Sequence, residues 1–488
     1  MTLRNIAFIA ARWTFLTSIC RAVLQAVLLL AVARYLSPTD VGQLAVITTF
    51  LSFLLIISDI GLSTSVMSID NDNRSYLSVI YMANIIFSVI VYASLYYFAV
   101  DIGSIIGDDG TGAPLRIAAI SVLIASVGQL YKTILEKKLH FRSVSLIEIV
   151  SNTIGFFVAV SCLLSGMGIY GIISGYLVTS LLATFGYLYE GAKLWRPTLS
   201  FDFAAAQPTL ARGIVYAVTA LLFALSQSVD VIVVGAVLGT TQLGLYSLPR
   251  DLCFKILFMI SPVISRVVLP LAARSQSDSK DMRALAQGAI EITATITFPV
   301  FAFIAFHHNQ IVTILFGEKW IYSAQILSII AVGTMFRLLV NPLGSLAYGA
   351  GKPKALVIQS FTGLVGITLF VMIGSGWGAI GASIGYTTFC FVNVFVAWLT
   401  IVRSVASISV TLYISTWFGP LAVAIISLLS SFLVIKMGLA VYLELILSLF
   451  LYSILYVSFM MGISKKNRNY IYDQVRYLYR LLGVRSDD

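Results

Sequence analysis

Nine charged side chains interrupt long apolar runs of this sequence, where a charge is costly. Each ionised group in hydrocarbon costs several kcal/mol, so it should face protein or a water-filled cavity. Guanidinium forks also suit phosphate oxygens better than ammonium groups do. We therefore predict substrate-binding cations for an anionic ligand and acids that could couple transport to an ion. The cations are Arg21, Arg250, Lys255 and Arg337; the candidate coupling acids are Asp59, Glu148, Asp230 and Glu291; Asp251 is the ninth charge.

The same charges have a plainer interpretation as ion pairs that join helices. Asp251 and Lys255 are four residues apart, so they can neutralise each other on one helix face. That pairing would leave Arg21, Arg250 and Arg337 as an unpaired cationic lining. Both interpretations, substrate binding and helix joining, stay open at this stage.

Other residue patterns give no catalytic, metal or cofactor site. The sequence G-x-G-x-x-G begins at Gly166 and again at Gly376, but no βαβ unit surrounds it, and glycines at this spacing indicate close helix packing. Adjacent His307 and His308 are expected in a solvated loop, as is Asp108. We expect no enzyme activity, no metal and no cofactor.

The elements that carry these charges are predicted membrane spans. Of 488 residues, 59% are hydrophobic and 11% charged, and the mean hydropathy is +0.96. A soluble domain carries about a quarter charged residues. Apolar runs of about twenty residues recur along the whole chain, which predicts an all-α membrane protein with about 14 transmembrane helices.

The basic residues predict the orientation of these spans. Most Lys and Arg residues fall in alternate loops, and the charge-poor loops between them include an acidic one at 101–112. The rule that positive loops stay inside then places both termini in the cytoplasm of a bacterium, with the protein in its inner membrane. The net charge of +10 reflects these loops, and we expect no nucleic-acid partner.

An internal repeat divides the chain. SGMGIYGIISGY at 165–176 recurs as SGWGAIGASIGY at 375–386, and LSPTDVGQL at 36–44 resembles LGTTQLGLY at 238–246. Because six predicted spans separate the copies, the two halves have parallel topology, with a binding site expected at their interface. We predict six-helix bundles at 1–195 and 196–405, two further transmembrane helices at 406–463, and a basic cytoplasmic tail at 464–488 that forms an interfacial helix.

Several short segments, taken in order, resemble the polysaccharide transporter (oligosaccharide flippase) family of the multidrug/oligosaccharidyl-lipid/polysaccharide exporter superfamily. The resemblance covers nearly the whole chain and rests on RYLSPTDVG at 34–42, DIGLS at 59–63, the segment 230–246, LFGEKW at 315–320, GAGKPK at 349–354 and GAIGA at 378–382. It implies alternating access and transfer of an undecaprenyl-diphosphate-linked oligosaccharide across the inner membrane. Such a protein would serve exopolysaccharide, capsule or O-antigen synthesis, beside membrane lipids and polysaccharide polymerase and chain-length proteins.

Two other functions compete with this one. A cation-coupled multidrug antiporter of the same superfamily would need a mainly acidic cavity, whereas the intramembrane charges here include four cations. A membrane-bound polymerase or glycosyltransferase would need a large outer loop with catalytic residues, and the predicted outer loops are short.

Overall fold

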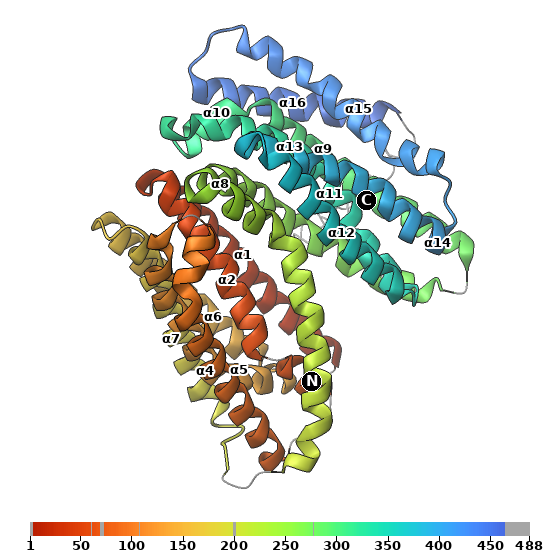
Figure 1. Ribbon diagram of the computed structural model, residues 1–488. Helices are drawn as coiled ribbons and strands as arrows, with labels where there is room; N and C mark the ends of the chain where they lie inside the picture. The colour runs from red at the N-terminus through yellow and green to blue at the C-terminus, as the bar shows by residue number, and fades with distance from the viewer. Residues whose placement is uncertain are drawn as a thin grey trace. The chain divides into compact units, whose positions relative to one another are not determined.

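The described part of the computed structural model, residues 3–59, 61–68, 73–106, 108–198, 202–276 and 278–463, contains helices and no strand. Figure 1 labels most of them. Thirteen of the described helical segments are long and apolar enough to cross a membrane, which confirms a multi-pass, all-α membrane protein. In chain order the elements are α1 (Leu3–Tyr35), α2 (Pro38–Asp59), α3 (Leu62–Ser68), α4 (Arg74–Ile105), η1 (Asp109–Thr111), α5 (Gly112–Lys137), α6 (Phe141–Leu164), α7 (Ile169–Gly191), α8 (Phe203–Arg274), α9 (Ser279–Phe306), α10 (His308–Leu315), η2 (Glu318–Trp320), α11 (Ile321–Gly349), α12 (Pro353–Ser375), α13 (Gly378–Ala397), η3 (Trp398–Val402), α14 (Arg403–Ala406), α15 (Val410–Ile435) and α16 (Val441–Ile463).

Helix α8 is two spans joined at a break. Gly239, near its middle, has the non-helical angles φ 78° and ψ 174°. An unbroken helix would separate Asp230 from Arg250 by about 30 Å, yet their side chains are 2.9 Å apart. The chain therefore reverses direction at Gly239. Counting α8 as two spans brings the total in the described chain to the predicted fourteen.

The described residues group into two compact units. The first contains the chain up to Lys255 together with Ser360–Tyr386, and the second contains Ile256–Gln359 and the chain from Thr387 onward. The predicted boundaries at 195, 405 and 463 follow the sequence repeat and stay predictions. The predicted interfacial helix at 464–488 lies outside the described residues.

Glycines close the two helical hairpins that carry the longer repeat. Gly168, between α6 and α7, and its counterpart Gly378, between α12 and α13, have positive φ angles of 56° and 73°. A Cβ on Gly171 would lie 2.9 Å from the backbone nitrogen of Leu163, and one on Gly381 would overlap a backbone oxygen of α12. These contacts confirm that the repeated G-x-G-x-x-G sequence packs helices closely.

In the second unit, α16 supplies hydrogen-bond donors to backbone carbonyls of α9 near its proline. Pro299 has no N–H, so the carbonyl of Thr295, four residues earlier, loses its helical donor. The Tyr456 hydroxyl donates to that carbonyl at 2.9 Å, and the Tyr452 hydroxyl donates to the Pro299 carbonyl at 3.1 Å. The final span, which lies outside the repeat, thus has a structural role at this proline.

His307, in the turn between α9 and α10, is fully buried rather than solvated as its sequence suggested. Its ring lies 4.4 Å from that of Phe303 and 5.0 Å from that of Phe306, and neither ring nitrogen meets a partner among the described residues. Burial, with a smaller effect of neighbouring His308, lowers the pKa of His307 from 6.5 to about 4.

This burial predicts that acidification destabilises the protein. Between pH 6.5 and 4 the unfolded chain binds a proton at His307 that the folded chain does not. The free energy of unfolding should therefore fall by about 1.4 kcal/mol for each pH unit below 6.5. Melting curves of the purified protein at pH 7.5 and 5 measure this effect. His307→Phe should reduce the pH dependence and His308→Ala should retain it; an unchanged slope in His307→Phe would contradict the assignment.

Candidate functional site

The two copies of the shorter repeat, residues 36–44 and 238–246, lie against each other in the first unit. A Cβ on Gly42 would overlap the backbone carbonyl of Thr240, and a Cβ on Gly244 would overlap that of Pro38. Positions 38 and 240 correspond in the repeat, as do 42 and 244, so the contact is reciprocal, like one across a two-fold axis. We call these two segments the repeat contact.

A pair of threonines lies at the centre of the repeat contact. The hydroxyls of Thr39 and Thr241, which are also equivalent in the repeat, are 2.9 Å apart and form a hydrogen bond in an exposed position. Such a bond contributes about 1 kcal/mol. The bond between Thr39 and Thr241 is therefore a weak, neutral link between the two segments.

Asp108, in the loop after α4, joins both segments of the repeat contact. It accepts a hydrogen bond of 2.7 Å from Gln43 and one of 2.9 Å from the backbone N–H of Gly110, and it also bonds Thr240. Burial raises the pKa of Asp108, but these hydrogen bonds outweigh it and hold the pKa below its usual value. The predicted solvated loop did not include these hydrogen bonds, because no local pattern reveals a partner 65 residues away.

Asp230 and Arg250 form a buried pair that closes the α8 hairpin below the repeat contact. The Arg250 Nε and Nη2 groups both donate to the Asp230 carboxylate, and Nη2 also donates to the Gln227 carbonyl at 2.6 Å. The Tyr246 hydroxyl donates to the same carboxylate at 3.0 Å, and the Phe254 ring lies 4.0 Å from the guanidinium. The exposed fractions are 6% for Arg250 and 2% for Asp230.

This geometry corrects part of the sequence interpretation. Arg250 is not an unpaired cation, because the Asp230 carboxylate accepts hydrogen bonds from two N–H groups, Nε and Nη2, of its guanidinium. Asp251 lies 3.5 Å from Arg250 rather than in contact with Lys255. Lys255 influences Asp251 only through space, and it forms no ion pair within the described residues. Whether these residues bind substrate stays a prediction.

Glu148 is the centre of a second charged cluster, formed by α1, α5, α6 and α7. It accepts hydrogen bonds from Lys132 at 2.7 Å, Arg21 at 3.2 Å and Tyr187 at 3.3 Å. Glu136 lies 3.9 Å from Lys132. The two cations and two acids balance, so Glu148 acts as a counter-charge here. Even so, 46% of the Arg21 side chain remains exposed, which leaves donors for a further anion.

The other predicted site residues are Asp59, Glu291 and Arg337. Asp59, at the end of α2, accepts a hydrogen bond of 2.6 Å from Ser63, which in turn accepts one from Gln129. Glu291 on α9 and Arg337 on α11 are half-buried in the second unit. Their roles in coupling and substrate binding stay predictions.

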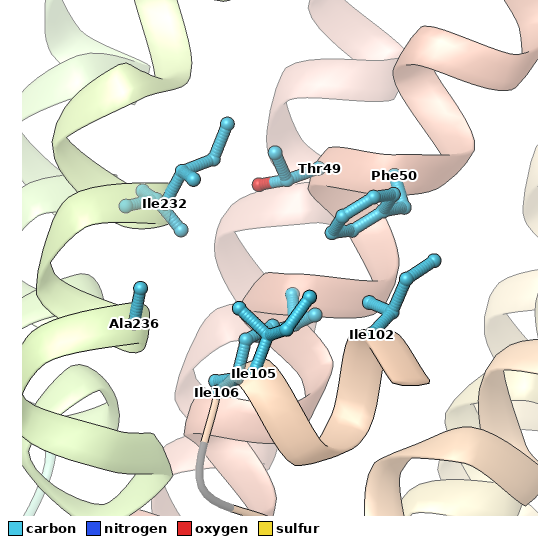
Figure 2. A pocket seen from close by; sticks show the side chains of 9 residues that line it. Thr49, Phe50, Ile102, Ile105, Ile106, Ile232 and Ala236 are labelled. Carbon is cyan, nitrogen blue, oxygen red and sulfur yellow. The ribbon is translucent and has the colours of Figure 1, made fainter. Parts of the chain in front are cut away.

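A small apolar pocket lies between α2, α4 and the first span of α8. Figure 2 shows Phe50, Ile102, Ile105 and Ile232 around it, with the Thr49 hydroxyl as the labelled polar atom. With no charged group in its lining, this pocket fits a hydrocarbon chain and does not suit a phosphate.

Comparison with known proteins gives one family match and several distant relatives. The family described as "Polysaccharide biosynthesis protein" matches residues 31–325. The teichuronic acid biosynthesis protein TuaB of Bacillus subtilis (strain 168) is 27% identical over 75% of this chain and 76% of its own. The lipopolysaccharide biosynthesis protein WzxC of Escherichia coli (strain K12) is 23% identical over 88% of each chain.

Solved structures share the fold. The lipid II flippase MurJ in an inward closed conformation superposes with a TM-score of 0.72 at 14% identity, over 93% of this chain and 99% of its own. An inward-facing multidrug resistance transporter of the MATE family gives a TM-score of 0.65 at 15% identity, over 79% of this chain and 95% of its own. At these identities the likeness concerns the fold alone.

Proposed function

This chain belongs to the polysaccharide biosynthesis protein family, and we propose from that premise that it flips a lipid-linked oligosaccharide across the membrane by alternating access. As a multi-pass membrane transporter of polysaccharide synthesis, it needs a substrate that is anchored in the membrane by a lipid. We infer an oligosaccharide on undecaprenyl diphosphate, moved from the inner to the outer leaflet of the bacterial inner membrane for exopolysaccharide, capsule or O-antigen synthesis. Relatives named for teichuronic acid and lipopolysaccharide synthesis support this inference.

The repeat contact is the observation that carries the mechanism. Alternating access needs two similar halves that separate at one end of the molecule while they close at the other. Equivalent residues of the two repeats meet at Gly42 and Gly244, and the exposed Thr39–Thr241 bond links them. We propose that this contact is the outer gate and that it opens to release the substrate.

The diphosphate requires cations once it leaves water. We propose that Arg21, Lys255 and Arg337 contact it, whereas Arg250 holds the α8 hairpin beneath the gate. Lys255 is the strongest candidate for diphosphate binding, because it is half-buried and makes no ion pair among the described residues. The acids Asp59, Glu148, Asp230 and Glu291 remain candidates for ion coupling, with Glu148 and Asp230 engaged by their cations in this state.

A flipping assay with Lys255→Ala tests the proposed function. The protein is reconstituted in vesicles that contain a fluorescent undecaprenyl-diphosphate oligosaccharide, and transfer between leaflets is measured by quenching. A charged hydrogen bond contributes about 1.5 to 3 kcal/mol, so we expect flipping to fall roughly tenfold or more. The melting temperature should not change, since no ion pair within the described chain is lost.

Two controls make that result specific. Lys255→Arg should keep most of the activity because the charge remains, and Lys280→Ala, which removes an exposed charge at the start of α9, should flip normally. Normal flipping by Lys255→Ala would remove this residue from the substrate site. Absence of flipping in the unmodified protein, together with proton-coupled export of a cationic drug, would favour the multidrug antiporter instead.

Orientation is tested by labelling single cysteines in intact cells with a membrane-impermeant maleimide. We expect Met167→Cys and Trp377→Cys, which are exposed in the α6–α7 and α12–α13 turns, to be labelled from outside. His140→Cys and Lys354→Cys are exposed in the opposite loops and should react only after permeabilisation. The reverse pattern would contradict cytoplasmic termini.

A further inference from the structure

The cluster around Glu148 holds one carboxylate between two cations from different helices. Lys132 on α5 donates to one Glu148 oxygen at 2.7 Å, and Arg21 on α1 donates to the other at 3.2 Å. The Tyr187 hydroxyl on α7 adds a third donor at 3.3 Å. Helix α6, which carries Glu148, packs on both α1 and α7 (Figure 1). Donors from three helices thus converge on a single anionic group.

This arrangement of donors also suits a phosphate group. A phosphate has several acceptor oxygens, and guanidinium, ammonium and hydroxyl groups can all donate to them. The exposed fraction of the side chain is 46% for Arg21 and 30% for Lys132, but 16% for Glu148. Both cations are therefore accessible to a second anion, although the carboxylate between them is largely buried.

The cluster lies a short way inside one end of the first unit. Lys132 and Tyr187 are in the last turns of α5 and α7, and Glu148 is in the second turn of α6. At 1.5 Å per residue, these positions are about 6 to 11 Å from the helix ends. On the proposed orientation this is the cytoplasmic end. A diphosphate carried by a lipid of the inner leaflet would meet these cations as it leaves water.

We propose that the substrate diphosphate displaces Glu148 from Arg21 and Lys132 and takes its position between them. This inference rests on the proposed function and adds Lys132 to the residues that contact the substrate. Two acids, Glu148 and Glu136, already contact the two cations. A diphosphate bound beside both acids would bring like charges together, which is unfavourable in a site of low dielectric constant. The substrate must therefore exchange with Glu148.

The exchange makes Glu148 a competitor of the substrate. Both anions require the same donors on Arg21 and Lys132, so removing the charge of Glu148 should strengthen diphosphate binding. An ion pair that only joins helices predicts no gain, because its loss can only loosen the cluster. The direction of the change in affinity thus separates the two roles.

Binding of undecaprenyl diphosphate to the full-length protein in detergent tests the exchange, with affinity measured by isothermal titration calorimetry. Glu148→Gln removes the charge but keeps an acceptor for Tyr187, and we expect its affinity to rise about tenfold, the effect of one charged hydrogen bond. Lys132→Ala should lower the affinity by about tenfold or more. Lys132→Arg should keep most of it, because the charge remains. Melting temperatures measured alongside show that each variant is folded.

Glu190→Gln is the matched control. Glu190 also pairs with a lysine, Lys193 at 2.6 Å, at the same end of the first unit but outside the cluster. Its removal should leave the affinity unchanged. Inorganic diphosphate should compete for the site, and phosphatidylglycerol, with its single phosphate, should bind more weakly by about tenfold or more. Unchanged or weaker binding by Glu148→Gln would overturn the proposal, as would tighter binding of phosphatidylglycerol than of undecaprenyl diphosphate.

These binding measurements do not depend on transport, so the two proposals can fail separately. If the unmodified protein flips the substrate but Glu148→Gln and Lys132→Ala bind it with unchanged affinity, the exchange at Glu148 is wrong and the proposed function stands. If the affinities change as expected but no substrate is flipped, the diphosphate site stands and the proposed function is wrong.

Discussion

Flipping should stop when a Thr39→Cys/Thr241→Cys variant is oxidised, and a reducing agent should restore it. The two hydroxyls are 2.9 Å apart, so sulfur atoms in their place can form a disulfide with little movement of the backbone. The bond would join the two repeats at the repeat contact and prevent the outer gate from opening. We expect loss of nearly all transport, measured as leaflet transfer of the fluorescent substrate in vesicles.

This experiment needs a background without Cys20, Cys162, Cys253 and Cys390, which must itself be active. Each single cysteine variant controls for the loss of the hydroxyl and should flip before and after oxidation. Substrate binding should survive in the oxidised protein, because only release is blocked. Full transport by a variant shown to be crosslinked would mean that the repeat contact does not open, and the proposed gate would be wrong.

The sequence identified the two segments of the repeat contact as copies but did not predict that they meet. Residues 36–44 and 238–246 were recognisable as copies because LSPTDVGQL and LGTTQLGLY follow equivalent spans. Nothing in either copy says that Gly42 of one meets Thr240 of the other, since that depends on how distant helices pack. The same limit applies to α8, where the sequence placed the end of a span before 238 but did not indicate that Asp230 meets Arg250 across the break at Gly239.

Hydropathy identified the charged residues of the site more readily than their partners. Glu148, Asp230 and Arg250 stand out because they interrupt apolar runs. Tyr187 and Tyr246, which donate hydrogen bonds to two of these acids, look like ordinary aromatic residues of a span. Both sequence interpretations of these acids, as coupling groups or as partners of cations, thus left out the neutral donors that the helix register supplies.

The Asp230–Arg250 pair predicts a large effect on stability. Asp230 is only 2% exposed, and Arg250→Ala removes its cation. Removing one partner of a buried ion pair lowers the free energy of unfolding by about 3 to 5 kcal/mol. We expect a marked fall in melting temperature and poor expression. If Arg250 only closes the α8 hairpin, flipping should fall in proportion to the folded protein that remains.

A double-mutant cycle separates this structural role from substrate binding. Asp230→Ala/Arg250→Ala removes both charges and should be more stable than Arg250→Ala alone, since no uncompensated carboxylate remains. If Arg250 only closes the hairpin, the double variant should also regain flipping as its stability returns. Recovery of stability without recovery of flipping would show that Arg250, Asp230 or both act in transport itself, and the purely helix-joining interpretation would then fail for this pair.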